Sequence, residues 1–281
     1  MGTSVEFQPR GAFEPLSELR GGGVFNLQHG QWTDDTSMAL CLATSLVERQ
    51  GFDAHDQMER YLAWMEDGYL SSTGRCFDIG ATVRAALLRY RQSGDPMAGS
   101  SDPNSAGNGS LMRLTPVAMF YYPERDKMLF YAEQSSCTTH AAEEAVQACR
   151  LLADLLYRAF QGVAKDQLLH SSQPDEYSAI KIRAIANGDY QSKDAARIKG
   201  SGYVVESLEA ALWCFWTTSS LESAVLAAAN LGDDADTTAA ICGQLAGACW
   251  GESGIPREWR DGLAQPEMIE KALAGVLTGG L

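Results

Sequence analysis

The chain has 281 residues, 45% of them hydrophobic, and carries a formal net charge of −14. Such an acidic protein lacks the basic surface that phosphate backbones require, so we expect no nucleic acid as a partner. No apolar run reaches the roughly 18 residues of a membrane span, and the first residues, MGTSVEFQPR, contain no signal-peptide core. We therefore expect a soluble, cytoplasmic protein that does not contact membranes.

The cysteines predict neither a disulfide framework nor a zinc site. Seven of them are scattered through the chain, mostly inside apolar helical patterns, and no two form a C-x-x-C pair. An odd number in this setting is typical of reduced thiols in a hydrophobic core.

Helical periodicity dominates the chain, as in Val146, Cys149, Ala153, Leu156 and Phe160. The predicted helices, in chain order, cover residues 36–49, 56–67, 78–92, 111–121, 126–135, 140–161, 203–217, 221–229, 237–250 and 267–274. No alternating pattern typical of strands competes with them. We predict one compact, all-α, multi-helix domain over residues 1–281.

Two connecting segments stand out. Residues 93–110, SGDPMAGSSDPNSAGNGS, form the longest polar connector, and a loop of this length in a compact domain is more often functional or mobile than idle. Residues 171–202 are the least regular stretch, and we expect short helices and loops there.

The first acidic cluster stands at the start of the helix predicted at 36–49. Thr33 can cap this helix, and Asp34 and Asp35 complement the positive end of the helix dipole by about 0.3–1 kcal/mol each. Capping alone therefore explains this cluster, unless a second one elsewhere in the chain joins it.

The second acidic cluster, in NLGDDADTT, precedes the helix predicted at 237–250. In an extended backbone, Asp234 and Asp236 would point the same way, and the Thr237 hydroxyl would complete the face. If the two clusters meet, their carboxylates repel one another unless cations lie between them. Hard divalent cations such as Mg²⁺ take oxygen ligands, and the absence of His and Cys near either cluster disfavours zinc.

Six motifs resemble those of the ADP-ribosylglycohydrolase family, most of all its bacterial branch containing dinitrogenase reductase-activating glycohydrolase. In collinear order they are WTDDTSMAL (32–40), DIGATVRAAL (78–87), GNGSLMRLTPVAMFY (107–121), TTHAAEEAVQAC (138–149), SGYVVESLEAALWCF (201–215) and NLGDDADTTAAICGQLAGACWG (230–251). The resemblance implies an all-α fold, a centre of two Mg²⁺ or Mn²⁺ ions, and hydrolysis of the bond between ADP-ribose and a modified side chain, typically arginine.

The resemblance also implies roles for the acidic clusters. The matching metal ligands are Thr33, Asp34, Asp35, Asp234, Asp236 and Thr237. Glu6 resembles a family glutamate beside the metals that would act as general base or gate. Together with Asp35 and Asp234, it forms the expected catalytic set.

The GNGS segment resembles the loop that holds the ribose and diphosphate. Its residues Gly107, Asn108, Gly109 and Ser110 would let backbone N–H groups approach phosphate oxygens, and Met112 follows them. Arg113 could pair with an acidic neighbour or with substrate.

Three further residues have a functional and a structural interpretation each. Asp78 resembles the family's substrate-contacting aspartate, although capping of the following helix explains it equally well. His140 would line the pocket or be a satisfied histidine at a helix start. Tyr203 would stack near the adenosine or the scissile ribose, or lie in the core.

The expected function is metal-dependent removal of ADP-ribose from protein side chains, most of all from arginine. The expected partners are an ADP-ribosylated protein and ADP-ribose, and the oligomeric state stays open. The alternatives are another ADP-ribosyl linkage, another N-glycoside, or a noncatalytic protein that binds ADP-ribose or blocks a toxin.

The family ordinarily opens with a small-residue helix containing a Gly-Asp-Ala step. This chain begins at Met1-Gly2, in the segment that follows that helix. We therefore expect either a misassigned start or a protein lacking that helix.

Overall fold

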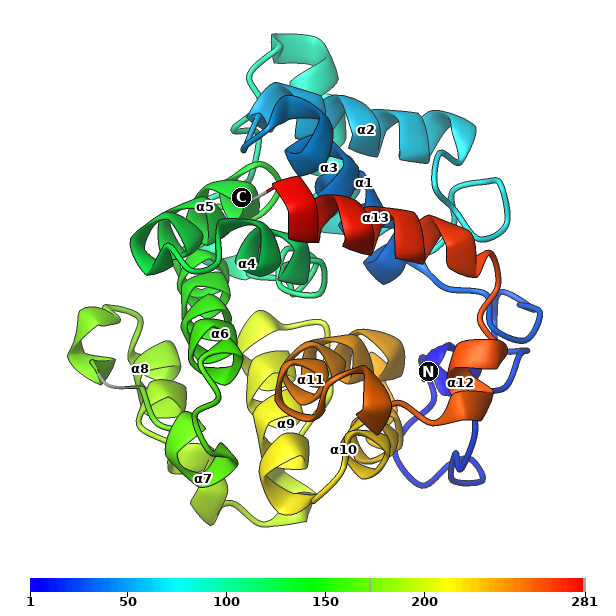
Figure 1. Ribbon diagram of the computed structural model, residues 1–281, viewed down its shortest axis with the longest axis vertical. Coiled ribbons are helices and arrows are strands. Elements are labelled where there is room, and N and C mark those ends of the chain that lie inside the picture. The colour runs from blue at the N-terminus through cyan, green and yellow to red at the C-terminus, as the bar shows by residue number, and fades with distance from the viewer. Residues whose placement is uncertain (172, 280–281) are drawn as a thin grey trace. The chain divides into compact units, whose positions relative to one another are not determined.

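The computed structural model describes residues 1–171 and 173–279, which form helices and no β-sheet (Figure 1). The α-helices are α1 (Asp34–Arg49), α2 (Ala54–Asp67), α3 (Ala81–Ser93), α4 (Thr115–Tyr121), α5 (Arg125–Cys137), α6 (Glu143–Phe160), α7 (Lys165–Leu168), α8 (Ile180–Ala186), α9 (Val204–Thr217), α10 (Leu221–Ala229), α11 (Ala235–Trp250), α12 (Arg257–Asp261) and α13 (Pro266–Gly279). The 3₁₀ helices are η1 (Thr3–Val5), η2 (Pro103–Ser105), η3 (Pro174–Glu176), η4 (Asp189–Ser192), η5 (Ala195–Arg197) and η6 (Glu252–Gly254). The predicted all-α class is confirmed. Residue 172 of the predicted irregular segment and residues 280–281 of the predicted domain lie outside the described residues.

Each predicted helix is present, but three begin three or more residues later than the apolar spacing indicated. The helix predicted from residue 78 begins at Ala81, because Asp78 has a left-handed backbone with a φ of 59°. The helix predicted from residue 111 begins at Thr115, where Pro116 favours the first turn. The helix predicted from residue 140 begins near Glu143, because His140 forms a parallel bridge with Ser100.

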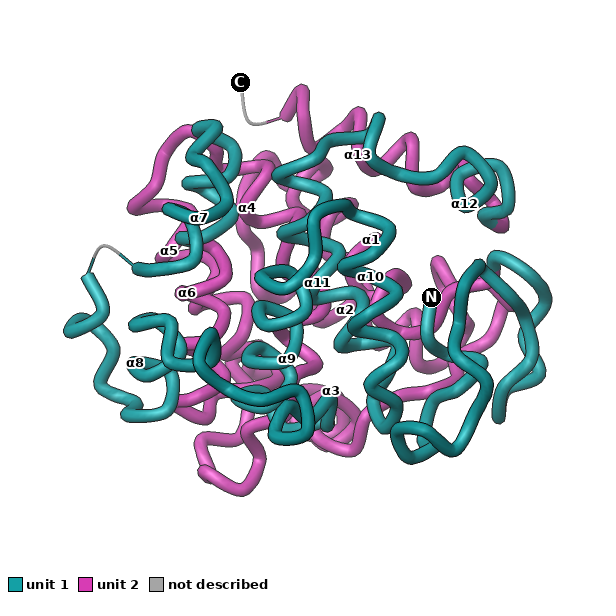
Figure 2. The backbone as a smooth tube through the Cα atoms, turned by 90° about the horizontal axis from the view of Figure 1, so that it is seen from below, with its two compact units in different colours: residues 1–30, 154–263 teal, residues 31–153, 264–281 magenta. Residues whose placement is uncertain are grey.

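The described chain divides into two compact units (Figure 2). Unit 1 contains residues 1–30 and 154–263, and unit 2 contains residues 31–153 and 264–281. One boundary between them falls inside α6. Each unit has its own buried apolar residues, so each is described by itself.

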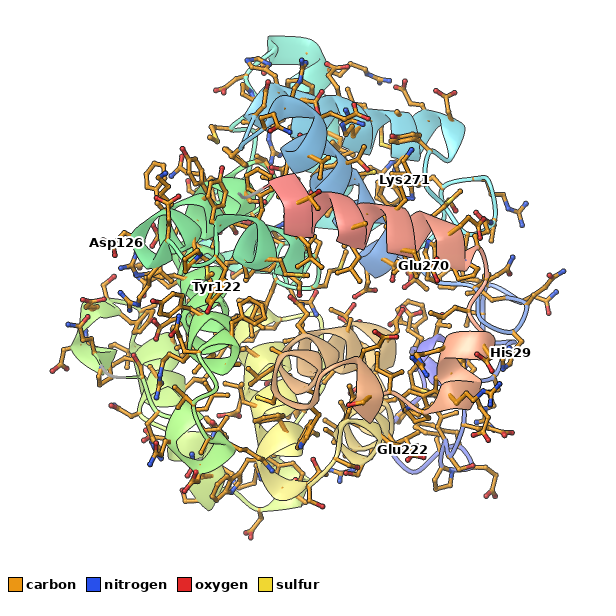
Figure 3. All side chains as sticks on the ribbon, in the orientation of Figure 1. His29, Tyr122, Asp126, Glu222, Glu270 and Lys271 are labelled. Carbon is orange, nitrogen blue, oxygen red and sulfur yellow. The ribbon has the colours of Figure 1, made fainter. Side chains whose placement is uncertain are left out.

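In unit 2, α1 packs against α2, α4 and α13. Its buried face includes Met38, Leu42 and Leu46, which lie four residues apart and are at most 1% exposed. Full burial of each such side chain stabilises the fold by roughly 1.5–3 kcal/mol. Helix α13 is amphipathic, and its outer face carries the exposed Glu270 and Lys271 (Figure 3).

In unit 1, α9, α10 and α11 pack against one another, and η1 contacts α11. The AAICGQLAGA stretch of α11 is rich in small residues, and Ala239 and Ala246 within it are buried. The described part of residues 171–202 contains α8 and three 3₁₀ helices, which confirms the short helices and loops predicted there.

The cysteines are free thiols, as their scatter predicted. Burial raises the pKa of Cys41 to about 12 and that of Cys149 to about 11, so neither is a reactive thiolate near pH 7. Within residues 1–171 and 173–279, no helix combines the length and apolarity needed to cross a bilayer.

Candidate active site

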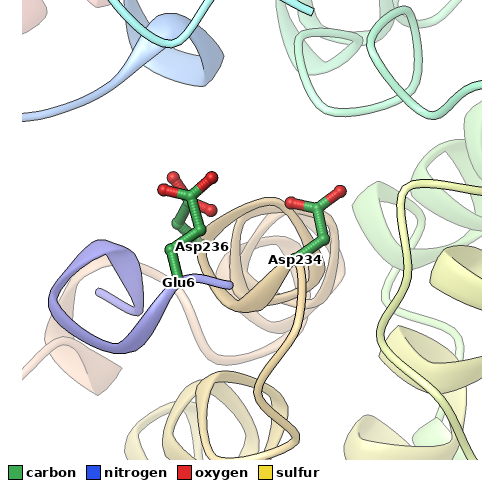
Figure 4. A group of neighbouring side chains, drawn as sticks. All are labelled: Glu6, Asp234 and Asp236. Atoms are coloured by element: carbon green, nitrogen blue, oxygen red, sulfur yellow. The ribbon is translucent and has the colours of Figure 1, made fainter. Parts of the chain in front are cut away.

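Three carboxylates of unit 1 converge at the N-terminal end of α11 (Figure 4). One oxygen each from Glu6, Asp234 and Asp236 lies within 4.8 Å of the others. Glu6 and Asp236 are buried, and Asp234 is half-buried. Asp234 is the N-cap of α11 and Asp236 lies in its first turn, so the motif is helical and not extended. The helical turn nevertheless directs both carboxylates to the same place.

The segment after η1 places Glu6 beside α11. The N–H of Phe7 donates to the carbonyl of Asp233 at 2.8 Å, and the N–H of Asp233 donates to the carbonyl of Gln8 at 2.8 Å. The Thr3 hydroxyl lies 3.5 Å from Glu6 Oε2. These two backbone bonds join Phe7 and Gln8 to Asp233, which precedes α11. They fix the position of the neighbouring Glu6 relative to the start of α11.

The donor set of this cluster fits a hard divalent cation. All three ligand groups are carboxylates, the type that Mg²⁺ and Mn²⁺ accept. Like charges at this separation and burial repel one another, and a cation between them removes that repulsion. Thr237, the next predicted ligand, is buried in the same helical turn.

The first acidic cluster lies at the start of α1 in unit 2. Thr33 is the N-cap, but its hydroxyl does not cap the helix; it donates to Asp35 Oδ2 at 2.9 Å. Asp34 and Asp35 form the first turn and are 7% and 5% exposed. Thr33 therefore holds the predicted N-cap position without a capping bond from its hydroxyl, and capping does not require carboxylates to be buried. The predicted ligands thus come from both units; their shared use of one metal centre stays a prediction.

The Gly107–Ser110 loop of unit 2 presents two backbone donors. The carbonyl of Asn108 accepts from the N–H groups of Leu111 and Met112 and closes a turn. Among the described residues, none accepts a hydrogen bond from the N–H of Gly109 or Ser110. Buried N–H groups normally find an acceptor, so this pair suits an anionic ligand.

The side chains after the glycines point inward. The Ser110 hydroxyl lies 2.8 Å from the Ser136 hydroxyl and 3.5 Å from Cys149 Sγ. Met112 is 5% exposed. Ser110 would therefore meet a ligand through its backbone, and the role predicted for Met112 stays a prediction.

His140 packs against the loop and precedes α6, so the interpretation as a helix-start residue is wrong. A Cβ on Gly109 would lie 2.9 Å from His140 Cε1. The ring is 2% exposed, and its Nδ1 lies 2.8 Å from the Thr139 hydroxyl oxygen. Burial first, and the nearby Arg113 charge second, lower the pKa of His140 to about 3, so the ring is neutral at physiological pH.

Arg113 is fully buried beneath the loop, and both interpretations offered for it are wrong. Its guanidinium donates to the Gly109 carbonyl at 3.0 Å, the Ser135 carbonyl at 3.3 Å and the Thr139 hydroxyl at 2.8 Å. It also lies 4.7 Å from the centroid of the Tyr61 ring. No carboxylate among residues 1–171 and 173–279 pairs with it, and burial keeps it from touching a ligand.

Asp78 does not cap α3, because the N-cap is Gly80. Asp78 is half-buried, and its left-handed φ of 59° is an uncommon conformation for a residue with a side chain. Such strain often accompanies function. The substrate contact remains a prediction.

Tyr203 is the half-buried N-cap of α9, so the interpretation as a core tyrosine is wrong. The exposed Lys181 donates to its hydroxyl at 2.7 Å and lies 5.0 Å from the ring centroid. A Cβ on the preceding Gly202 would lie 3.6 Å from Asp234 Oδ2, which ties this turn to the acidic cluster. Nothing in the sequence indicated that Lys181 contacts Tyr203, because Lys181 lies in the irregular segment 171–202, outside the six motifs.

Comparisons with known proteins identify the family of this chain. The family model for ADP-ribosylglycohydrolase matches residues 1–280. The chain is 43% identical to "ADP-ribosylarginine hydrolase Tri1" of Pseudomonas putida (strain GB-1), over 96% of this chain and 72% of that protein. It is 27% identical to "ADP-ribosyl-[dinitrogen reductase] glycohydrolase" of Rhodospirillum rubrum, over 92% of this chain and 84% of that protein.

A solved structure described as an "ADP-ribosylglycohydrolase-related protein complex" superposes with a TM-score of 0.87 and 39% identity, covering 100% of this chain and 93% of the other. The family match spans almost the whole sequence, and the curated relative is well above 30% identical. The chain that carries this acidic cluster and this glycine loop therefore belongs to the ADP-ribosylglycohydrolase family.

Proposed function

We propose that this protein hydrolyses the bond that joins ADP-ribose to an arginine side chain of a modified protein. The observation that carries the proposal is the convergence of Glu6, Asp234 and Asp236 at the start of α11, in a chain of the ADP-ribosylglycohydrolase family. The choice of arginine is supported by relatives named ADP-ribosylarginine hydrolase, which are 43% and 40% identical to this chain.

The proposed metal centre holds two Mg²⁺ or Mn²⁺ ions. Its ligands would be Asp234, Asp236 and Thr237 from α11 and its N-cap, and Thr33, Asp34 and Asp35 from the start of α1. Bound ions of this kind would hold ribose hydroxyls and lower the pKa of a water molecule.

The loop and its neighbours would bind the rest of ADP-ribose. The N–H groups of Gly109 and Ser110 would donate to diphosphate oxygens, with Gly107 and Asn108 alongside the ribose. Tyr203 would stack on the adenosine or the scissile ribose, and Asp78 would contact the substrate. These side chains fix the sugar so that one face of its anomeric carbon is open to water.

The reaction exchanges one bond for another at the anomeric carbon. The oxygen of water attacks this carbon while the carbon–nitrogen bond to the guanidine breaks, and the products are ADP-ribose and arginine. Glu6 would accept a proton from the attacking water at a carboxylate oxygen. Asp35 and Asp234 would stabilise the positive charge that develops on the sugar as the guanidine leaves with its electron pair.

The test is a turnover assay on proteins carrying ADP-ribose on arginine, serine or cysteine, measured in parallel with Mg²⁺ and Mn²⁺. We expect metal-dependent release from arginine. Asp236→Asn and Asp34→Asn should each lower kcat/KM by at least about 100-fold, because each removes a ligand charge. The control is Asp233→Asn, an exposed residue adjacent to the cluster that is absent from the proposed ligand set.

Full turnover in Asp236→Asn or Asp34→Asn would overturn the metal assignment. Release from serine alone would retain the hydrolase and reject the choice of arginine. Binding of ADP-ribose without turnover of any linkage would reject the catalytic proposal.

A further inference from the structure

A continuous hydrogen-bonded relay runs beneath the Gly107–Ser110 loop of unit 2. The guanidinium of Arg113 donates to the Thr139 hydroxyl oxygen at 2.8 Å, and that oxygen lies 2.8 Å from Nδ1 of His140. The three side chains are at most 2% exposed. Their chemistry decides where the proton of the histidine ring lies.

The proton position follows from what each group can donate. A guanidinium has donors only, so the Thr139 oxygen must accept from Arg113 and its own O–H proton remains to be placed. Within the described part of the chain, His140 Nδ1 is the one acceptor in range of that hydroxyl. The Thr139 hydroxyl therefore donates to Nδ1, which must be unprotonated.

A neutral imidazole with an unprotonated Nδ1 carries its proton on Nε2. The ring is neutral because burial and the Arg113 charge lower the pKa of His140 to about 3. His140 thus offers one N–H donor, at the ring edge that packs on Gly109; a Cβ on Gly109 would lie 3.3 Å from Nε2.

That donor has no protein partner, since no described acceptor lies within hydrogen-bond range of His140 Nε2. The same is true of the N–H groups of Gly109 and Ser110 in the adjacent loop. Gly109 is half-buried and Ser110 is buried, so these three donors lie together at the edge of the protein interior and suit one external acceptor. The Arg113 charge has no carboxylate to neutralise it among the described residues, so the acceptor should be an anion.

We propose that Arg113 and Thr139 are positioning residues that lock His140 with its proton on Nε2, so that His140 donates to an anionic oxygen bound at Gly109 and Ser110. Taking this oxygen as one of the ADP-ribose diphosphate rests on the proposed function. Arg113 does not touch the ligand. It polarises the Thr139 hydroxyl and, through it, the His140 ring, because each donated hydrogen bond strengthens the next one in the chain.

Nuclear magnetic resonance of the full chain labelled with ¹⁵N-histidine tests the proton position directly. The resonances of His140 are assigned by their loss in His140→Gln. We expect a pyridine-type Nδ1 and a protonated Nε2 at neutral pH, and a change of the Nε2 resonance when ADP-ribose is added. A protonated Nδ1 in the wild-type protein would overturn the proposal.

Two neighbouring threonines provide a matched pair of variants. Thr139→Val removes the relay, and we expect a changed Nδ1 resonance with roughly tenfold weaker binding of ADP-ribose, the effect of one charge-assisted hydrogen bond. Thr138→Val is the control: Thr138 is equally buried, donates to the Ser135 carbonyl and accepts from Arg113 at 3.5 Å, but no hydrogen bond joins it to His140. The affinity of Thr138→Val for ADP-ribose should stay within twofold of the wild-type value. Its His140 resonances should superimpose on those of the wild type.

Thr139→Ser keeps the hydroxyl and should restore both the Nδ1 resonance and the affinity. Equal losses in Thr139→Val and Thr138→Val would show a packing role only and overturn the relay. If His140 shows the expected tautomer but the protein releases ADP-ribose from no linkage, the proposed reaction is refuted and the proposal for Arg113, Thr139 and His140 is retained.

Discussion

Gly2 packs so closely on α11 that a Cβ on it would lie 2.6 Å from the backbone nitrogen of Asp236. Its φ of 101° is also in the left-handed region that favours glycine. This contact brings the N-terminal segment to the start of α11, where Glu6 meets Asp234 and Asp236.

We therefore expect Gly2→Ala to separate Glu6 from the other two carboxylates. The added methyl group must push the N-terminal segment away from the backbone of α11. We expect this clash to lower the free energy of unfolding by about 1–3 kcal/mol, in addition to the effect of the backbone strain. Titration calorimetry with Mg²⁺ should show roughly tenfold weaker binding, because one ligand is displaced.

The control for this substitution is Gly11→Ala. Gly11 has a similarly positive φ of 78°, but a Cβ there would meet nothing within 4 Å. The Gly11→Ala variant therefore has the backbone strain of a left-handed alanine but no steric clash. Equal Mg²⁺ affinities in the two variants would show that the Gly2 contact does not organise the cluster.

Gly109→Ala should weaken ADP-ribose binding by roughly tenfold. The methyl group would lie 2.9 Å from His140 Cε1 and 3.3 Å from Val83 Cγ2, and neither neighbour can move far in a buried place. The loop must shift instead and carry its N–H donors with it.

Gly80→Ala is the matched control, because Gly80 also has a negative φ and open space around its Cβ position. Calorimetric affinity for ADP-ribose decides between them. An unchanged affinity in Gly109→Ala would remove the loop from the proposed ligand site.

Arg113→Met should lower the free energy of unfolding by about 3–5 kcal/mol. The methionine fills part of the volume but leaves the Gly109 carbonyl and the Thr139 hydroxyl without their side-chain donor, while the Ser135 carbonyl keeps the Thr138 hydroxyl. Urea titration followed by circular dichroism measures this loss.

Arg91→Met serves as the comparison. The Arg91 and Glu66 side chains form an ion pair at 2.9 Å while 56% and 48% exposed, and such pairs contribute about 0–1 kcal/mol. Similar losses in both variants would contradict the assignment of Arg113 as a structural support of the loop.

Protonation of His140 should oppose folding at acidic pH. Its pKa is about 3 in the folded protein against 6.5 for an ordinary histidine, so between these values the unfolded chain binds the extra proton. Its contribution to stability is complete above pH 6.5 and is lost as pH falls toward 3, by about 1.4 kcal/mol per pH unit.

Other groups titrate in the same range, so the measurement is a difference. The free energy of unfolding of the wild type and of His140→Gln is followed from pH 7 to pH 4. The wild-type curve should fall more steeply with acid below pH 6.5. Parallel curves would show that His140 is not held neutral by the fold.

The helices could be predicted from local pattern, since apolar spacing and capping act within a few residues. Leu221–Ala229 matches its prediction, and α1 begins at the cap that Thr33 indicated. The six motifs also indicated the family. Spacing could not place the start of α3, because apolar spacing carries no signal for the left-handed backbone of Asp78.

The acidic and glycine-rich motifs determined by themselves which residue types the site would use. Only the tertiary structure decided that Glu6 joins Asp234 and Asp236, through backbone bonds between segments more than 220 residues apart. It also decided that Arg113 is a buried support for the loop and not a ligand contact. The reason is physical: a carboxylate or a guanidinium has the same local preferences in either role, and its burial and partners are set by distant parts of the chain.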